Sequence, residues 1–174
     1  MPQIFKIFAL GKGRKRSAII VNNNIDATAN LQVSDEDTVS IERSYEGLAF
    51  YGASLYFPID REIERDIETV EEIIRLTKGN GLILSIASNS RSKLWYGTTR
   101  NQRGKTLEQF IITSVLLLMN KATGIPTLET TGGRSWIHLT LCSNILAQKT
   151  ELMEVWRGRK LRRPQDYIFR YFTR

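Results

Sequence analysis

The sequence predicts a single α/β domain, a sandwich in which helices pack on a mixed β-sheet. Its 174 residues are 41% hydrophobic and 25% charged, a composition typical of one folded globular domain. Segments with strand and helix periodicity alternate along the chain. Neither an internal repeat nor a low-complexity linker divides it. We therefore expect one domain over residues 1–174.

The first half of the chain begins with strands. Residues 17–21 are a short, branched apolar run, which predicts a buried strand. Residues 38–43 alternate between apolar and polar side chains, and residues 47–57 form a longer apolar and aromatic strand that ends at Pro58. The short connection at residues 44–46 predicts a hairpin between these two strands.

An amphipathic helix follows. Asp60 is a candidate N-cap and Gly79 a candidate C-terminal stop. Four apolar residues repeat between them at helical spacing: Ile63, Ile67, Val70 and Ile74. We expect the Asp and Glu residues of this helix to face solvent.

The second half predicts three more strands and one helix. Residues 82–86 form an apolar run of strand length, residues 136–142 are again strand-like, and residues 166–172 alternate at period two. Thr106 and Gln109 form a capping-box pattern. The apolar residues that follow predict a second helix on the sheet: Leu107, Phe110, Ile111, Val115 and Leu118.

The composition excludes several classes of protein. One cysteine, Cys142, allows no intrachain disulfide, and one histidine, His138, is too few for a Cys/His zinc site. The longest apolar stretch, residues 115–119, is too short to span a membrane. The glycines of residues 11–13 precede a strand, whereas a nucleotide-binding phosphate loop precedes a helix. We expect Cys142 in the core and His138 as a packed strand residue rather than part of a serine-hydrolase triad.

Positive charge is concentrated at the two ends of the chain. Residues 1–20 sum to +5 and residues 155–174 to +6, so the intervening residues sum to −4. Clustered cations favour a polyanionic partner such as nucleic acid, although solvated termini have the same composition. The candidate nucleic-acid contacts of the N-terminal cluster are Lys12, Arg14, Lys15 and Arg16.

Four blocks of sequence carry a family resemblance. One block consists of residues 84–95 with the Asn-Gln-Arg-Gly turn at 101–104. The other three are residues 53–58, 135–140 and 163–168, and all four agree with one family in their order and spacing along the chain. Together they resemble the DNase I-like endonuclease/exonuclease/phosphatase superfamily, more narrowly the apurinic-endonuclease-like domain of non-LTR retrotransposons. The resemblance implies two mixed β-sheets flanked by helices. It also places the family's first strands upstream of Met1, so we expect an N-terminally incomplete domain whose open edge favours self-association.

The resemblance implies Mg²⁺-assisted phosphodiester cleavage, but the chemical positions differ from the family pattern. Ala87 stands where the family has the water-orienting Asp, His138 where it has a second Asp, and Gln165 where it has His. Tyr56 and Asn89 keep the family identity. Each also has an ordinary structural interpretation, as a strand end and as a turn residue. We expect no metal ligand set and no cofactor in this chain.

A basic loop accompanies these positions, and its candidate phosphate contacts are Arg91, Lys93, Arg100, Arg103 and Lys105. Trp95 beside them favours packing over base stacking. The favoured interpretation is a catalytically inactive, retroelement-derived domain with weak, non-specific DNA binding. The alternative is an active phosphodiesterase rebuilt around Tyr56, Asn89 and His138. A third interpretation, a domesticated interaction module, differs only in its cellular partner. The short apolar stretches and the absence of a secretory signal in residues 1–10 predict an intracellular protein without a membrane partner. If it is a retroelement product, we expect it in the nucleus and as part of a longer polyprotein.

Overall fold

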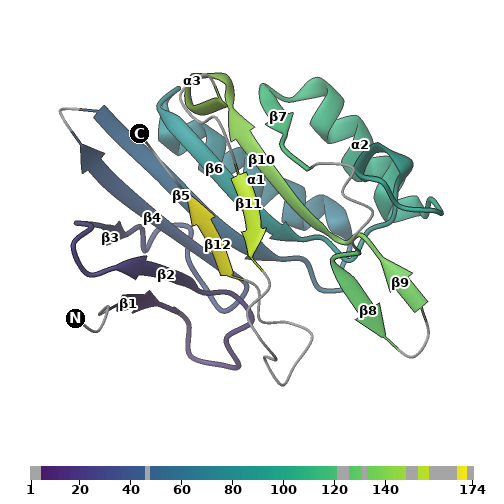
Figure 1. Ribbon diagram of the computed structural model, residues 1–174, viewed down its shortest axis with the longest axis horizontal. Helices are drawn as coiled ribbons and strands as arrows, with labels where there is room; N and C mark the ends of the chain where they lie inside the picture. Colours follow the sequence, from purple (N-terminus) through teal and green to yellow (C-terminus); the bar gives the residue numbers. More distant parts are fainter. Residues whose placement is uncertain are drawn as a thin grey trace.

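A six-stranded mixed sheet forms the centre of the computed structural model, which describes residues 5–45, 48–120, 126–130, 133–147, 153–156 and 168–171. In spatial order its strands are β3 (Thr28–Ala29), β4 (Thr38–Tyr45), β5 (Leu48–Tyr56), β6 (Gly81–Ala87), β10 (His138–Ser143) and β7 (Leu116–Leu118). Only β5 and β6 pair in parallel; the other pairs are antiparallel. The helices α1 (Ile63–Thr77) and α2 (Gln102–Thr113) cover one face, behind the sheet in Figure 1. The predicted α/β arrangement is confirmed.

Three antiparallel two-stranded sheets complete the described strands. They are β1 (Phe5–Phe8) with β2 (Ile19–Asn22), β8 (Leu128–Thr130) with β9 (Gly133–Ser135), and β11 (Met153–Trp156) with β12 (Ile168–Tyr171). A short helix, α3 (Asn144–Ala147), follows β10. In Figure 1, β11 and β12 are drawn on the side of the central sheet opposite to α1 and α2.

The main core lies between the central sheet and the two long helices. The strand β6 is almost wholly buried, as the apolar run of residues 82–86 predicted. From β6 and β10, Leu82, Leu84, Leu139 and Leu141 are at most 1% exposed, and they share a cluster with apolar residues of both helices. Cys142 is buried on the opposite face of the sheet, as expected.

Both helix starts differ from the sequence prediction. Asp60 does not cap α1, which begins after Glu62 without a side-chain cap. The cap of α2 is Asn101, whose side chain accepts from the Gly104 amide. Thr106 therefore lies inside the helix, where its hydroxyl donates to the carbonyl of Gln102. The second helix also ends earlier than predicted, since residues 116–118 form β7 instead of its last turn.

Two burial predictions are wrong as well. Asp66, on the first turn of α1, is 2% exposed although we expected it to face solvent. The strand near residues 17–21 exists as β2, but Ile20 is 43% exposed because β2 pairs only with β1 and lies outside the central sheet. The strand β1 itself was not predicted. The hairpin of β4 and β5 is confirmed.

Candidate functional site

The strand register brings three of the predicted site positions into one row. Tyr56 at the end of β5 pairs with Ala87 at the end of β6, and Ala87 pairs with His138 at the start of β10. Directly paired residues point to the same side of a sheet. Their chain neighbours Leu55, Ile86 and Leu139 face the helices, so the row lies on the opposite face.

Asn89 lies in the loop after β6 and ties it to the residue that follows β5. Its backbone is left-handed, with φ 49°, a conformation that Asn tolerates better than most residues. The side-chain Nδ2 donates to the carbonyl of Phe57 at 2.9 Å, and the amide of Phe57 donates to the carbonyl of Ala87 at 3.0 Å. The position of Asn89 is therefore fixed by contacts within the protein.

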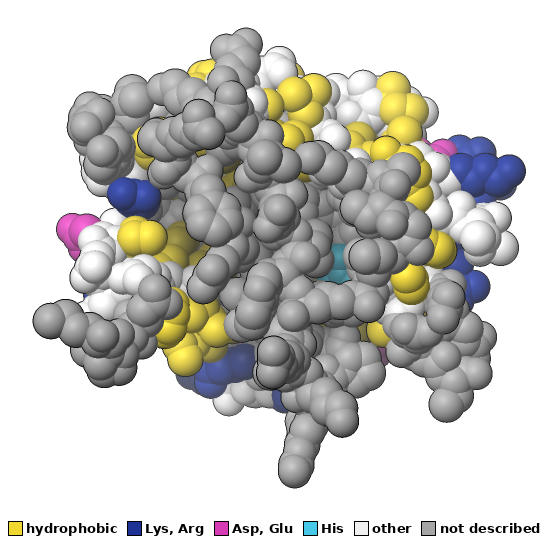
Figure 2. Space-filling model, viewed as in Figure 1, with side chains coloured by type: hydrophobic (Ala, Val, Ile, Leu, Met, Phe, Trp, Pro, Cys, Tyr) yellow, Lys and Arg dark blue, Asp and Glu magenta, His cyan; other side chains and the backbone are white. Residues whose placement is uncertain are grey.

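The row carries little charge. Ala87 contributes a methyl group, and burial lowers the pKa of His138 to about 4, so its imidazole is neutral at neutral pH. Figure 2 shows the side chain of this histidine, in cyan, on the face opposite to the long helices. Gln165, the third substituted position, lies outside the described residues.

Magnesium does not fit the described residues of the row. The ion binds carboxylate, carbonyl and water oxygens, whereas Tyr56, Ala87, Asn89 and His138 supply no carboxylate. Across the part of the chain that the structure describes, no group of three or more His, Cys, Asp or Glu side chains is placed to hold a metal ion. We therefore derive no step through a metal ion.

The basic N-terminal loop is fastened beside Tyr56. Glu36 accepts the amides of Lys12 and Gly13 on one carboxylate oxygen, at 2.8 and 2.9 Å, and these hydrogen bonds, that from Gly13 foremost, lower the pKa of Glu36. Gly11 has φ 90°, and a Cβ there would lie 2.7 Å from the backbone nitrogen of Glu36. The loop thus presents the exposed side chains of Lys12, Arg14 and Lys15 from a defined backbone.

Arg16 differs from these three cations. Its guanidinium makes a two-pronged ion pair with Asp37, at 2.5 and 2.7 Å, and lies 5.0 Å from the centre of the Tyr56 ring. The hydrogen bond to Asp37 raises the pKa of Arg16 further above its already high value. Arg16 therefore links the N-terminal loop to Tyr56, a role that its place in a basic run did not indicate.

The second basic cluster, like the first, contains cations that are paired within the protein and cations that are exposed. Arg100 pairs with Glu108, and Arg103 is largely buried, donating to the carbonyl of Arg61 and lying 3.6 Å from Asp66. The side chains of Arg91, Lys93 and Lys105 are exposed, and no ion pair is recorded for them within the described residues. These three remain the candidate phosphate contacts of the cluster. In Figure 2 the Lys and Arg side chains, in dark blue, appear at separate places around the outline of the face.

A chain of ion pairs connects these regions through the protein. Asp37 pairs with Arg16 and, at 3.5 Å, with Arg61; Asp66 pairs with Arg61 and Arg103. Both acidic residues are buried, with side chains that are 6% and 1% exposed. Burial raises the pKa of Asp66, and the Arg61 hydrogen bond opposes that shift. Sequence reasoning missed both acids, because the arginines that pair with Asp37 are distant along the chain and the local pattern of α1 does not distinguish Asp66 from its exposed acidic neighbours.

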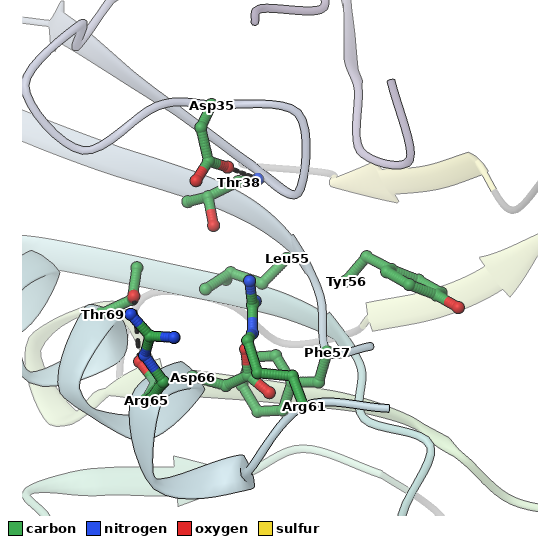
Figure 3. Close-up of a pocket in the computed structure, with 9 residues that line it drawn as sticks. All are labelled: Asp35, Thr38, Leu55, Tyr56, Phe57, Arg61, Arg65, Asp66 and Thr69. Atoms are coloured by element: carbon green, nitrogen blue, oxygen red, sulfur yellow. Dashed lines mark hydrogen bonds and ion pairs between the residues drawn. The ribbon is translucent and has the colours of Figure 1, made fainter. Parts of the chain in front are cut away.

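A hollow of about 200 Å³ lies beside this chain of ion pairs, between β5 and α1. Asp35, Arg61, Arg65 and Asp66 contribute equal numbers of positive and negative charges to its wall. Tyr56 also borders it, but its ring points away from the other labelled side chains (Figure 3). The hollow is therefore distinct from the row at the strand ends.

Comparison with known proteins identifies the family. A sequence profile described as endonuclease-reverse transcriptase matches residues 50–160, which include the whole row and the loop after it. The chain belongs to this family. The profile confirms the predicted resemblance, and it covers three of the four blocks on which that resemblance was based, all but residues 163–168.

Solved structures show the fold of this family member. The endonuclease domain of TRAS1, a telomere-specific non-LTR retrotransposon, is similar with a TM-score of 0.77 at 19% identity, over 87% of this chain and 72% of that domain. The predicted DNase I-like fold is confirmed. The human nocturnin catalytic domain has a TM-score of 0.46 at 13% identity, over 88% of this chain and 62% of that one. An endonuclease/exonuclease/phosphatase family protein from Bacteroides thetaiotaomicron has a TM-score of 0.49 at 14% identity, over 96% and 71%.

No match was found among curated protein sequences. None of the described helices is long and apolar enough to cross a membrane.

Proposed function

We propose that this endonuclease-like domain binds nucleic acid through phosphate contacts without cleaving it. The observation that carries the proposal is the row of Tyr56, Ala87 and His138. In the related cleaving enzymes two of these three positions are occupied by Asp, as the family resemblance implies. Here a methyl group and a neutral imidazole replace the two carboxylates, so the row offers neither a strong base nor a ligand that Mg²⁺ prefers.

Binding is supported by where the exposed cations lie. Lys12, Arg14 and Lys15 project from the loop that Arg16 joins to Tyr56, and Arg91 and Lys93 lie on the loop that leaves the end of β6. Exposed cations on two loops that adjoin the ends of β5 and β6 suit a polyanionic partner near this end of the sheet. Contacts between cations and phosphates carry no sequence information, so we expect weak, sequence-independent binding that weakens steeply with salt.

An active phosphodiesterase rebuilt around Tyr56, Asn89 and His138 is the competing function. Two observations argue against it. The amide of Asn89 is already bonded to the Phe57 carbonyl, and an imidazole with a pKa of about 4 is a weak base at neutral pH. The cleavage assay described in the Discussion separates the two functions.

Fluorescence anisotropy with a labelled DNA duplex at two salt concentrations tests the binding. The double variant Arg14→Ala/Lys15→Ala should weaken binding at low salt and reduce the slope of log K against log salt by about 2, since each phosphate contact contributes about 0.9 to that slope. The matched control, Arg75→Ala/Lys78→Ala, removes the same charge at the C-terminal end of α1, which leads into the start of β6, whereas the row lies at the other end of that strand. Equal effects of the two variants, or no binding by the wild type at low salt, would contradict the proposed surface.

A further inference from the structure

The loop that leaves the site row is closed at its base and has a fixed shape. Residues 91 and 101 meet through two hydrogen bonds: the Asn101 amide donates to the Arg91 carbonyl at 3.1 Å, and the Arg91 amide donates to Oδ1 of Asn101 at 3.0 Å. Gly104 packs directly against this junction, because a Cβ there would lie 1.9 Å from the Arg91 carbonyl oxygen. We refer to residues 91–101 as the Trp95 loop.

The interior of the Trp95 loop is anchored as well. The Trp95 side chain is fully buried and donates to the carbonyl of Ser90 at 3.3 Å, which confirms that it packs rather than stacks on a base. The Ser92 hydroxyl is buried, accepts the Leu94 amide at 2.9 Å and donates to Glu108. The Gly97 amide donates to the Ser92 carbonyl at 2.8 Å, and a Cβ on Gly97 would lie 2.7 Å from that oxygen. The residues between these anchors are therefore held in place.

Tyr96 is one of those residues, and its placement is unusual. Its backbone is left-handed, with φ 69°, a conformation that glycine adopts freely and that strains a bulky side chain. The side chain is only partly buried, since Tyr96 is 43% exposed. Strained residues of this kind occur at ligand contacts more often than elsewhere, because packing alone does not favour them.

The charge around Tyr96 indicates the chemistry of a ligand. Arg91 and Lys93 are exposed on the same loop and Lys105 is exposed just beyond it, whereas Arg100 is paired with Glu108. An exposed aromatic ring between cations is the arrangement with which proteins bind single-stranded nucleic acid, in which bases stack on the ring and phosphates meet the cations. A base inside a duplex is already stacked and cannot use such a ring.

We infer that Tyr96 is a stacking platform for an unpaired nucleobase, with Arg91 and Lys93 contacting the flanking phosphates. The inference rests on the proposed function and narrows its ligand to nucleic acid with unpaired bases. It makes Tyr96 responsible for a preference between ligands of equal charge, whereas Arg91 and Lys93 contribute affinity that any phosphate backbone would receive.

Anisotropy with two labelled strands of equal length tests the inference. An oligothymidylate carries bases, and an abasic strand carries the same phosphates without them. The wild type should bind the oligothymidylate more tightly than the abasic strand. Tyr96→Gly should weaken oligothymidylate binding by about tenfold, at the lower end of the range for one stacked base, and leave binding to the abasic strand unchanged.

Three further measurements separate stacking from structural support. Tyr96→Phe keeps the ring and should bind both strands as the wild type does. Tyr96→Gly relieves the left-handed strain, so its Tm should equal or exceed that of the wild type. Lys78→Gly relieves the same strain at the end of α1, where φ is 48°, and should leave the preference for the oligothymidylate unchanged.

The outcomes distinguish this inference from the proposed function. If the wild type binds both strands equally and with a steep salt dependence, the proposed function stands and the stacking inference fails. If Tyr96→Gly lowers the Tm and weakens binding to both strands together, Tyr96 supports the loop and the inference is again overturned. If the wild type binds neither strand at low salt, the proposed function and the inference fall together.

Discussion

Replacing Gly104 by Ala should disrupt the contact between the base of the Trp95 loop and α2. The added Cβ would lie 1.9 Å from the Arg91 carbonyl oxygen and 2.8 Å from its carbon, both backbone atoms that no side-chain rotation can move. Since Cβ atoms essentially never approach another heavy atom within 3.0 Å, the two segments must separate by about 1.1 Å. The hydrogen bonds between residues 91 and 101 would then break.

The magnitude follows from what that separation removes. Two hydrogen bonds are lost at the junction, each with a net contribution of about 1 kcal/mol. The Asn101 cap, whose Oδ1 accepts the Gly104 amide at 2.8 Å, is disturbed at a cost of a further ~1 kcal/mol. We expect Gly104→Ala to lower the free energy of unfolding by about 3 kcal/mol.

Urea denaturation followed by tryptophan fluorescence measures this loss, and Gly52→Ala is the matched control. A Cβ on Gly52 would meet its nearest neighbour at 3.6 Å, an ordinary contact, so the same chemical change should alter stability by less than about 1 kcal/mol. If Gly104→Ala lowers the free energy of unfolding no more than Gly52→Ala does, Gly104 does not pack closely against the Arg91 carbonyl and the reasoning is refuted.

Three further predictions concern other parts of the molecule. The pKa of His138 is lowered to about 4 in the folded protein, so the histidine of the unfolded chain takes up a proton at higher pH than that of the folded protein. As the pH falls from 6.5 to 4, the wild type should therefore lose about 3 kcal/mol of stability relative to His138→Gln. Parallel stability profiles of the two proteins over this pH range would contradict this. Asp66→Asn should cost about 3 kcal/mol in urea denaturation, because Arg61 and Arg103 lose their buried counter-charge; a change below about 1 kcal/mol would show that the pairs contribute little. Ile7 is 68% exposed on the two-stranded sheet of β1 and β2, so the protein should self-associate as its concentration rises. Size-exclusion chromatography with light scattering should show a molar mass above that of the monomer, and Ile7→Lys should lower that molar mass. A wild type that is monomeric at every concentration would refute this prediction.

The sequence predicted those parts of the fold that depend on local patterns. Residues 82–86 are a bare apolar run because β6 is covered on both faces, and the helix near residues 63–74 shows its buried stripe directly. Tyr56 ends its strand, as its structural interpretation predicted, and the register adds that Ala87 and His138 complete its row.

Contacts between distant residues could not be predicted. Asp66 is buried because Arg61 and Arg103 reach it from a loop and from α2, and nothing in the local pattern of α1 distinguishes it from its solvated acidic neighbours. Arg16 belongs to a run of cations and yet differs from them through Asp37, 21 residues away. At Asn101 a local signal existed, since Asn is among the residues most favoured at the N-cap, but the Thr106 pattern competed with it.

The most direct test of the central claim is incubation of the purified chain with supercoiled plasmid and Mg²⁺, with binding measured on the same sample by gel retardation. We predict retarded plasmid at low salt, release at higher salt, and no conversion to the nicked circular form at any Mg²⁺ concentration. Nicking that depends on Mg²⁺ and is lost in both Asn89→Ala and His138→Ala would contradict the account and establish the rebuilt active site in its place.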